Sequence, residues 1–329
     1  MITIPIPPEL LEYLRVRGTY LVVSHVDPDG DCIGSSLAFG HFLSRLGNTV
    51  HLLNCGPFDR TEIAQYESMF STSVPPEFAN SPGDARVVVL DASTIERIGD
   101  LQHSIAGLPT AVIDHHSSGQ PFGDARMINA ASPSTSYLVQ QIIEALGYSP
   151  DKAEAEYLLF ALVADTGFFR FLDERSGEVF ESTARLVSAG ASPSNTYYQM
   201  YGGHSMESRK MLAKLLKRTR TYCNGKLLVV WKTRRDTRLL GGDGHDSASL
   251  YQLLMTTREC KVIVYLRDVD GRTCTGSLRS SNSIDVGQIA KVYGGGGHSR
   301  AAGFHARRPM RVVRNELVAT FSSMLSEDQ

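Results

Sequence analysis

The sequence predicts an α/β fold, with a doubly wound, mainly parallel sheet in an N-terminal domain and a smaller α/β domain after it. In the first half, short apolar runs alternate with helical patterns. The runs Ala85–Ser93 and Pro109–His116 are apolar on both faces, which is typical of buried parallel strands. In the last third, Asn-Gly and Asp-Gly pairs separate strand-like runs, which indicates hairpins in the second domain.

The first domain is predicted to contain four strands and three main helices. The strands are Tyr20–Ser24, Thr49–Asn54, Ala85–Ser93 and Pro109–His116. The helices are a stripe from Ile33 to Leu46, then Ser136–Leu146 and Lys152–Val163. Gly47 ends the first helical stripe, as glycine commonly does after a helix. Strands that alternate with helices in this way predict a parallel sheet.

The second domain is predicted to follow a turn-rich linker. Residues 1–190 are assigned to the first domain, 191–215 to the linker and 216–329 to the second. The segment Met206–Cys223 is predicted to be one long basic helix, or a helix that runs into a strand. Further strands are predicted at Lys226–Lys232, Lys261–Arg267 and Arg272–Leu278, and helices at Asp246–Thr256 and Val286–Val292.

The bulk composition excludes several classes of protein. The formal net charge is −2, so the whole chain does not attract nucleic acid or anionic lipid, and any site for a polyanion must be a local basic patch. The five cysteines form no C-x-x-C pair and are expected to be reduced thiols. The first residues lack the features of a signal peptide, and no apolar run is long enough to cross a membrane. We therefore expect a cytoplasmic protein with no membrane partner.

Acidic and histidine residues form four groups in the first domain. These are His25-x-x-x-Asp29-x-Asp31, then Asp91, then Asp114-His115-His116, and last Asp165. The first three groups come just past the ends of predicted strands, and the fourth follows an apolar helix. Because the carboxyl ends of parallel strands meet at one edge of a doubly wound sheet, we expect these side chains to lie close together.

Such a cluster is suited to divalent cations. Two imidazoles and four carboxylates form a mixed nitrogen and oxygen ligand set, which favours Mn²⁺, with Mg²⁺, Co²⁺ or Fe²⁺ as alternatives. The lack of thiolates argues against a structural zinc site. Six ligands exceed what one open catalytic ion needs, and they suit two ions about 3.5–4 Å apart that share a bridging carboxylate.

Each group also has a purely structural interpretation. A lone aspartate after a strand is usually a helix cap or a turn former, and this applies to Asp91 and Asp165 taken singly. His115 and His116 on their own could be core or surface residues. The predicted convergence of all four groups favours the metal site. Asp114 is expected to orient a neighbouring imidazole rather than to bind metal.

A second candidate site lies in the last third of the chain. The segments are GSLRSS, Gly276–Ser281, and YGGGGHSRAAGFHA, Tyr293–Ala306. Four consecutive glycines allow backbone N–H groups to approach an anion closely, and Arg279 could hold a phosphate with two hydrogen bonds. A flexible loop or a packing requirement would explain the glycines equally well.

These motifs resemble those of a known family. SHVDPDGDCIGSSLA, VVVLDAS, VIDHH and LVADTGFF resemble the four motifs of the DHH phosphoesterases, and GGGGHSRAAG resembles the signature of the DHH-associated C-terminal domain. The resemblance covers most of the chain, with every motif in the expected order. Within the family the chain is most similar to the bacterial nanoRNases that also act as phosphatases of 3′-phosphoadenosine 5′-phosphate (pAp).

The resemblance implies a role for each residue. His25 and Asp29 would hold a first metal ion, and Asp31, His115 and Asp165 a second, with Asp91 bridging both. His116 would lie near the scissile phosphate as a hydrogen-bond donor or acid, supported by Asp114. Arg279, Ser280, Gly294, Gly295, Gly296, Gly297 and His298 would bind the substrate. Cys32 is not expected to bind metal.

The resulting expectation is a two-metal phosphodiesterase with its substrate in a cleft between the domains. It would hydrolyse short oligoribonucleotides to nucleoside 5′-monophosphates, and pAp to AMP. The alternatives are a non-catalytic nucleotide-binding protein and a phosphatase of polyphosphate or cyclic dinucleotides. The sequence alone does not determine the oligomeric state, whereas the resemblance implies a dimer.

Overall fold

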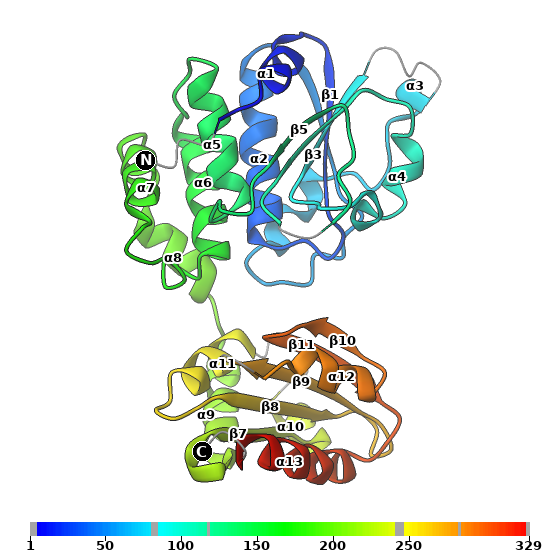
Figure 1. The fold of residues 1–329 in the computed structure, drawn as a ribbon, viewed down its shortest axis with the longest axis vertical. Helices are drawn as coiled ribbons and strands as arrows, with labels where there is room; N and C mark the ends of the chain where they lie inside the picture. The colour runs from blue at the N-terminus through cyan, green and yellow to red at the C-terminus, as the bar shows by residue number, and fades with distance from the viewer. Residues whose placement is uncertain (1–4, 80–84, 117–118, 241–246, 282–283, 327–329) are drawn as a thin grey trace. The chain divides into compact units, whose positions relative to one another are not determined.

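The computed structural model describes residues 5–79, 85–116, 119–240, 247–281 and 284–326. The chain forms two compact units, residues 1–202 and 203–329, which we call the N-terminal and C-terminal units. They are labelled by element in Figure 1. No helix in these described ranges is both long and apolar enough to cross a membrane.

The N-terminal unit is built on a five-stranded, fully parallel sheet with the strand order β2-β1-β3-β4-β5. The strands are β1 (Thr19–Ser24), β2 (Thr49–Leu53), β3 (Ala85–Leu90), β4 (Thr110–Asp114) and β5 (Ala125–Ile128). This order confirms the predicted doubly wound sheet. From β1 the chain adds β2 on one side, and it then adds β3, β4 and β5 on the other side. The strand order therefore switches between β1 and β3, and ligands bind at such a switch point in doubly wound folds.

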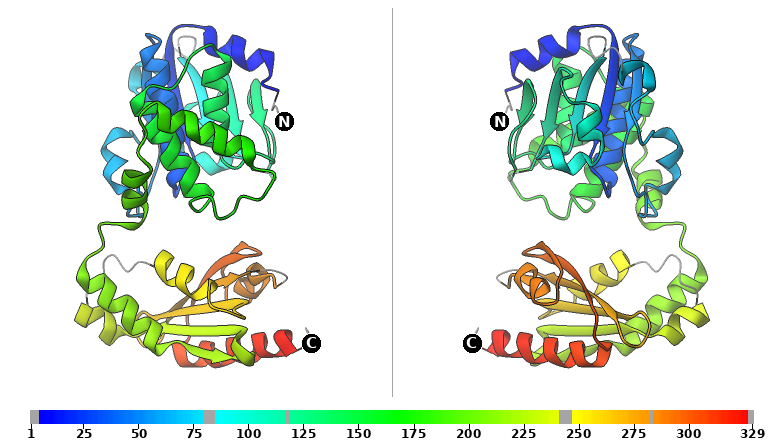
Figure 2. Two further views of the ribbon diagram at one scale, coloured as in Figure 1. Left: turned by 90° about the vertical axis from the view of Figure 1, so that its left-hand side faces the viewer. Right: turned by 90° about the vertical axis from the view of Figure 1, so that its right-hand side faces the viewer.

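Helices cover both faces of this sheet (Figures 1 and 2). The elements are α1 (Pro8–Arg15), α2 (Gly30–Arg45), η1 (Ala64–Met69), α3 (Pro76–Ala79), η2 (Ile95–Ile98), α4 (Leu101–Ser104), α5 (Thr135–Ala145), α6 (Lys152–Asp165), α7 (Gly177–Ser188) and α8 (Pro193–Tyr201). One core layer packs the sheet against α2, α5 and α6, and the other packs it against η2 and α4. Successive strand residues alternate between these two layers, so both faces of the sheet are buried.

Helices α2 and α6 pack closely because of two glycines. A Cβ atom added at Gly30 would lie 2.4 Å from the Cβ of Ala164, and one added at Gly34 would lie 2.7 Å from that of Ala161. Any larger residue would push the helices apart. The contact brings the amino end of α2 next to the carboxyl end of α6, and both ends carry predicted metal ligands.

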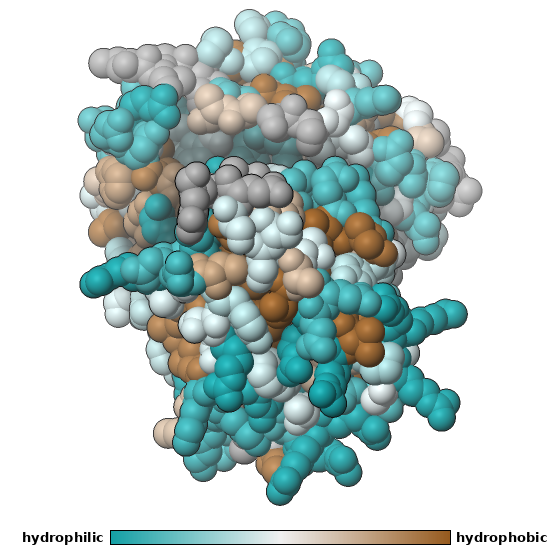
Figure 3. Space-filling model, turned by 60° about the horizontal axis from the view of Figure 1, so that its bottom comes forward, coloured by the Kyte–Doolittle hydropathy of each residue, from teal (hydrophilic) through white to brown (hydrophobic). Residues whose placement is uncertain are grey.

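The C-terminal unit is a six-stranded mixed sheet with the order β10-β11-β9-β8-β7-β6, in which only β7 and β8 are parallel. The elements are α9 (Met206–Arg218), β6 (Arg220–Tyr222), η3 (Cys223–Gly225), β7 (Leu227–Lys232), α10 (Arg234–Leu240), α11 (Ser247–Met255), β8 (Val262–Asp268), β9 (Cys274–Ser280), α12 (Val286–Val292), β10 (Gly296–His298), β11 (Ala301–Ala306) and α13 (Met310–Ser326). Helices α12 and α13 cover one face, and α9 and α11 the other. Hydrophilic residues dominate the surface seen in Figure 3.

The structure differs from the sequence prediction in several places. Residues 191–215, expected to be a linker, form α8 and most of α9, and the two units divide between Gly202 and Gly203. Strands β5, β10 and β11 and helix α13 were not predicted. The segment Met206–Cys223 is a helix that runs into a strand, α9 followed by β6, which is the second of the two predicted alternatives. The helix expected at Asp246–Thr256 is α11, and Asp246 lies outside the described residues. The predicted helix Val286–Val292 is confirmed residue by residue.

Candidate metal centre

The first part of the site forms where β1 and β3 end side by side. His25 follows β1, Asp91 follows β3, and both are almost fully buried. The His25 Nδ1 atom lies 2.7 Å from the carbonyl oxygen of Val26, so Nδ1 carries the proton and donates it. The other ring nitrogen, Nε2, faces the carboxylates and lies 3.4 Å from Asp91 Oδ2 and 3.9 Å from Asp29 Oδ1.

The amino end of α2 supplies two carboxylates. Asp29 caps the helix and accepts a hydrogen bond from the Cys32 N–H at 3.1 Å. Asp31 is buried and accepts backbone N–H bonds from Thr135 at 2.6 Å and from Ser136 at 3.0 Å. These donors belong to the first turn of α5, whose N–H groups have no partner within the helix. Two rigid helices therefore fix the position of the Asp31 carboxylate.

His115 is surrounded by three carboxylates. Its Nε2 atom lies 3.5 Å from Asp165 Oδ2, 3.6 Å from Asp91 Oδ1 and 3.9 Å from Asp31 Oδ2. Asp165 is the last residue of α6, and the close packing of α2 on α6 brings it to the sheet edge. The structure therefore brings together all six residues that the sequence predicted as metal ligands.

These separations fit metal coordination better than hydrogen bonding. Distances of 3.4–3.9 Å between imidazole nitrogen and carboxylate oxygen exceed those of good hydrogen bonds. Two atoms that each lie about 2.1 Å from one ion are at most about 4.2 Å apart, so the observed pairs could share a cation. Asp91 faces His25 with Oδ2 and His115 with Oδ1, as a bridging carboxylate would.

The electrostatics of the carboxylates also favour a bound cation. Burial, and then repulsion by neighbouring carboxylates, raise the pKa of Asp31 well above its usual range. Burial raises the pKa of Asp165 to about 6. Burial opposes ionisation of Asp91 as well, but the neighbouring imidazoles outweigh it and lower its pKa to about 2. Positive charge among these groups would relieve the repulsion, so the residues present fit divalent cations.

Cys32 lies beside this cluster, with His25 and Asp91 as neighbours. Its Sγ atom is 3.8 Å from the His25 carbonyl oxygen and 3.9 Å from Asn54 Nδ2. Burial raises the pKa of the thiol, which favours its protonated form when no ion is bound.

His116 and Asp114 form a hydrogen-bonded pair next to the cluster. Asp114 Oδ1 lies 2.7 Å from His116 Nδ1 and also accepts the backbone N–H groups of His115 and His116, at 2.8 and 3.2 Å. The hydrogen bond to Asp114 raises the pKa of His116. The Nε2 atom of His116 lies 3.4 Å from Arg97 Nη1. Asp114 therefore orients the imidazole, as expected.

Sequence reasoning missed three residues of this site. Thr135 donates its hydroxyl to Asp91 Oδ1 at 2.9 Å in addition to its N–H bond to Asp31, Ser136 supports Asp31, and Arg97 lies against His116. The Ser134 cap that starts α5 was a signal for the first two, because serine before a helix marks free N–H groups. Nothing in the local sequence around Arg97 indicated its role.

The residues predicted to bind substrate lie in the C-terminal unit and do not share one surface. Arg279 and Ser280 are consecutive on β9, so their side chains leave opposite faces of the sheet. The Arg279 guanidinium stacks 4.4 Å over the Tyr251 ring. The Ser280 hydroxyl is buried and has no hydrogen-bond partner among the described residues. The side chain of His298 lies outside the described residues.

Two of the four consecutive glycines have a packing role. A Cβ at Gly295 would lie 2.1 Å from the Gly303 carbonyl oxygen, and one at Gly297 would lie 2.5 Å from that of Ala301. A Cβ at Gly294 or Gly296 would meet nothing within 4 Å. The packing alternative therefore accounts for Gly295 and Gly297, whereas Gly294 and Gly296 are open to an approaching group.

Comparison with known families identifies the chain. The model of the DHH family, N-terminal domain, matches residues 19–164, and that of the DHHA1 domain matches residues 237–327. The chain therefore contains a DHH domain and a DHHA1 domain. The DHH match ends one residue before Asp165 and spans the other five candidate ligands. As a member of this phosphoesterase family, the chain is a hydrolase.

Individual relatives of this DHH protein extend the comparison to nearly the whole chain. It is 28% identical over 315 residues to the bifunctional oligoribonuclease and PAP phosphatase NrnA of Thermus thermophilus, covering 92% of this chain and 91% of that one. The crystal structure of an exopolyphosphatase-related protein from Bacteroides fragilis matches with a TM-score of 0.85 at 23% identity, covering 99% of this chain and all of that one. Exonuclease RecJ bound to manganese matches with a TM-score of 0.54 at 16% identity, covering 99% and 96%.

Proposed function

We propose that this DHH phosphoesterase is a metal-dependent phosphodiesterase that hydrolyses short oligoribonucleotides to nucleoside 5′-monophosphates, with the conversion of pAp to AMP as a second activity. The observation that carries the proposal is the placement of Asp91 between two groups of imidazole and carboxylate ligands, beside the His116–Asp114 pair. The substrate class is supported by the similarity to the Thermus thermophilus NrnA over nine-tenths of the chain, which includes both domains.

In this proposal two divalent cations, preferentially Mn²⁺, occupy the cluster. His25 and Asp29 would hold one ion, Asp31, His115 and Asp165 the other, and Asp91 both. When bound, such ions act as Lewis acids on phosphoryl oxygens and activate water as a nucleophile at neutral pH. The chain itself contributes the fixed geometry, because backbone N–H groups and the α2–α6 contact position the ligands before any ion binds.

His116 is proposed to act on the phosphate as a hydrogen-bond donor or acid. Asp114 holds the Nδ1 side of the ring, so Nε2 is the atom available to substrate. A raised pKa keeps a proton on the imidazole, which can stabilise a phosphoryl oxygen or pass to the departing 3′ oxygen. Hydrolysis then balances as follows: water adds to phosphorus, the bond from phosphorus to the 3′ oxygen breaks, and that oxygen leaves with a proton.

The C-terminal unit is proposed to bind the nucleotide through Arg279 and the glycine-rich segment. Arg279 presents a guanidinium beside the Tyr251 ring, a combination that suits a phosphate next to a base. A Cβ added at Gly294 or Gly296 would meet no atom within 4 Å, so a ligand has room to approach there, although the Gly294 N–H already donates to the Lys291 carbonyl oxygen at 3.0 Å. Ser280 follows Arg279 directly, but its buried hydroxyl lies on the opposite face of β9 and does not belong to this surface.

A substrate panel with purified protein and Mn²⁺ tests the proposal. We expect the highest kcat/KM for RNA of two to five nucleotides, with slower release of phosphate from pAp. Asp91→Asn protein serves as the control for contaminating nucleases. Exclusive turnover of polyphosphate or of cyclic dinucleotides would contradict the proposed substrate class. Tight binding of nucleotides with no metal-dependent turnover would instead indicate a non-catalytic binding protein.

A further inference from the structure

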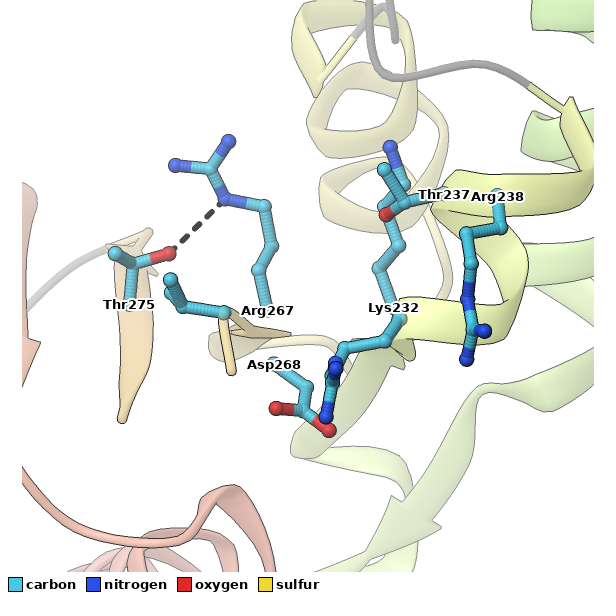
Figure 4. Close-up of a pocket in the computed structure, with 8 residues that line it drawn as sticks. Lys232, Thr237, Arg238, Arg267, Asp268 and Thr275 are labelled. Atoms are coloured by element: carbon cyan, nitrogen blue, oxygen red, sulfur yellow. Dashed lines mark hydrogen bonds between the residues drawn. The ribbon is translucent and has the colours of Figure 1, made fainter. Parts of the chain in front are cut away.

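A second polar site lies in the C-terminal unit, at the carboxyl ends of β7 and β8. It is a cavity of about 490 Å³. Four basic side chains line it, Lys232, Arg234, Arg238 and Arg267, together with Thr237 and Thr275 (Figure 4). Asp268 is the one acidic residue among the lining side chains that the structure describes. The cavity therefore carries a large excess of positive charge.

Lys232 occupies a costly position in this cavity. It is the last residue of β7 and is only 4% exposed. In the sheet register it pairs directly with Arg267 of β8, and the two side chains run side by side in Figure 4. Like charges on paired strand positions repel each other. Burial, and then the Arg267 charge, lower the pKa of Lys232.

No carboxylate forms an ion pair with Lys232 in the described part of the chain. The buried Asp236 is close enough to act on Lys232, but both of its oxygens accept from Arg218, and one also accepts from Lys214 at 2.6 Å. Asp268 accepts the Gly271 N–H through Oδ1 at 2.8 Å. The Lys232 ammonium forms no hydrogen bond or ion pair with any described residue. A buried cation that has no ion-pair partner favours the binding of an anionic ligand.

The cavity is separate from the predicted substrate residues. Thr275 and Arg279 both lie on β9 with their side chains on the same face, four residues apart, which corresponds to roughly 13 Å along the strand. Arg279 belongs with Tyr251 at one end of β9, and the cavity lies at the other end. The two groups of cations therefore contact different parts of any ligand.

The lining side chains match the chemistry of a phosphate group. Arginine binds phosphate with two parallel hydrogen bonds, lysine adds a point charge, and threonine hydroxyls donate to the remaining oxygens. The Arg267 Nε already donates to Thr275 Oγ1 at 3.0 Å, which holds the guanidinium at the cavity. The volume falls within the range of about 300–1,000 Å³ of small-molecule sites, so there is room for more than a phosphate ion.

We propose that this cavity is a second phosphate-binding site, which takes a phosphorylated ligand of about mononucleotide size through Lys232 and Arg267. The phosphate could belong to a distant part of the oligonucleotide substrate or to a separate nucleotide. Both sources present the same group to the same side chains. The proposal concerns binding and does not depend on whether the protein hydrolyses RNA.

The test uses the full chain in EDTA, with AMP and inorganic pyrophosphate as probes. Trp231 is the single tryptophan and lies next to Lys232 in β7, so its fluorescence reports the unfolding of the C-terminal unit. We expect both probes to raise the thermal midpoint of the wild-type protein. We expect Lys232→Met and Arg267→Gln each to weaken the probe affinity by about tenfold or more, the worth of one charge-assisted contact. Arg311→Gln, an exposed arginine on α13, is the matched control and should retain the shift.

Stability without ligand separates a binding role from a structural one. Lys232→Met removes a buried charge that has no partner, so the ligand-free variant should be as stable as the wild type or more stable. A lysine that holds the fold together would lose stability when replaced. Repeating the titration in Arg279→Ala protein removes any contribution from the predicted substrate residue.

Kinetics then identify the source of the phosphate. A raised KM for five-nucleotide RNA but not for a dinucleotide in Lys232→Met would place part of the substrate in the cavity. An unchanged KM with loss of the response to added AMP would indicate a separate nucleotide. The proposal is overturned if the probes shift the midpoints of wild-type and both variant proteins equally, or if they shift none of them. Because this binding test contains no metal, a failure of the proposed hydrolysis would not affect it.

Discussion

Replacing Asp91 by asparagine is the sharpest test of the metal centre. Asp91 faces His25 at 3.4 Å and His115 at 3.6 Å through different oxygens, so one substitution removes the charge from both ligand groups. Its backbone has a φ of 60°, a left-handed conformation that asparagine adopts readily and most other residues do not. Asn therefore changes the chemistry of the position while it preserves the local structure.

The expected size of the effect follows from the role of Asp91 toward both proposed ions. The loss of a group that stabilises charge in the transition state typically costs a factor of about 10²–10³ in kcat. Because Asp91 would bind both ions, we expect at least the upper value, which corresponds to about 4 kcal/mol. Metal binding should also stabilise the wild-type N-terminal unit, by about 2.7 kcal/mol at a free ion concentration of 100 times Kd. For a unit of this size the thermal midpoint would rise by about 5–10 °C.

The assay combines turnover, metal content and thermal unfolding. Wild-type protein should bind two Mn²⁺ per chain, lose thermal stability in EDTA and regain it with Mn²⁺, whereas Asp91→Asn should show little response to the metal. Asp27→Asn is the matched control, since Asp27 is exposed in the same sheet-edge region and also has a positive φ of 53°. A single ion per wild-type chain, or near-normal turnover in Asp91→Asn, would refute the bridging arrangement.

Three further predictions concern other parts of the chain. Asp114→Asn should lower kcat by about 10²-fold with little change in KM, because His116 loses its orienting carboxylate while substrate contacts remain. A rise in KM as large as the fall in kcat would contradict a purely positioning role. Arg279→Ala should weaken oligonucleotide binding by about 1.5–3 kcal/mol, seen as raised KM, and should spare bis-p-nitrophenyl phosphate. Asp236→Asn should destabilise the C-terminal unit by about 3 kcal/mol, measured by Trp231 fluorescence in denaturant, because it leaves two cations without their buried partner. Burial favours a high pKa of Asp236, but hydrogen bonds from its basic partners outweigh it and lower the pKa, so its stabilisation is complete above about pH 4 and is lost as the pH falls further.

The parallel sheet and the convergence of most of the candidate metal ligands could be predicted because they follow from local patterns. His25, Asp91 and His115 each come directly after an apolar strand, and the carboxyl ends of neighbouring parallel strands necessarily meet. Asp165 is different, since it follows a helix. Its place depends on the approach of α6 to α2 at Gly30 and Gly34, and periodicity within one segment contains no information on such a contact.

The C-terminal unit was harder to predict because its conformation depends on which strands pair with each other, and the paired strands belong to separate segments of the sequence. The glycine-rich segment was expected to be an anion-binding cradle, and part of it is the short strand β10, although glycine has a low strand propensity. The pairing of β10 with β11 decides its conformation, and this pairing lies outside the segment. In the same way, the juxtaposition of Lys232 and Arg267 follows from the register of β7 and β8, which the sequence of either strand alone does not reveal.

The origin of the ligands in four separate stretches of chain has a consequence for biosynthesis. His25 and Asp165 are 140 residues apart, and the proposed second ion would draw a ligand from every one of the four stretches. A nascent chain therefore could not bind the two proposed ions with native affinity until α6 has been synthesised and has packed on α2. Until then the carboxylates that follow β1 mainly repel one another, which disfavours their close approach at the edge of the sheet. Completion of the proposed metal centre would thus be a late step in folding.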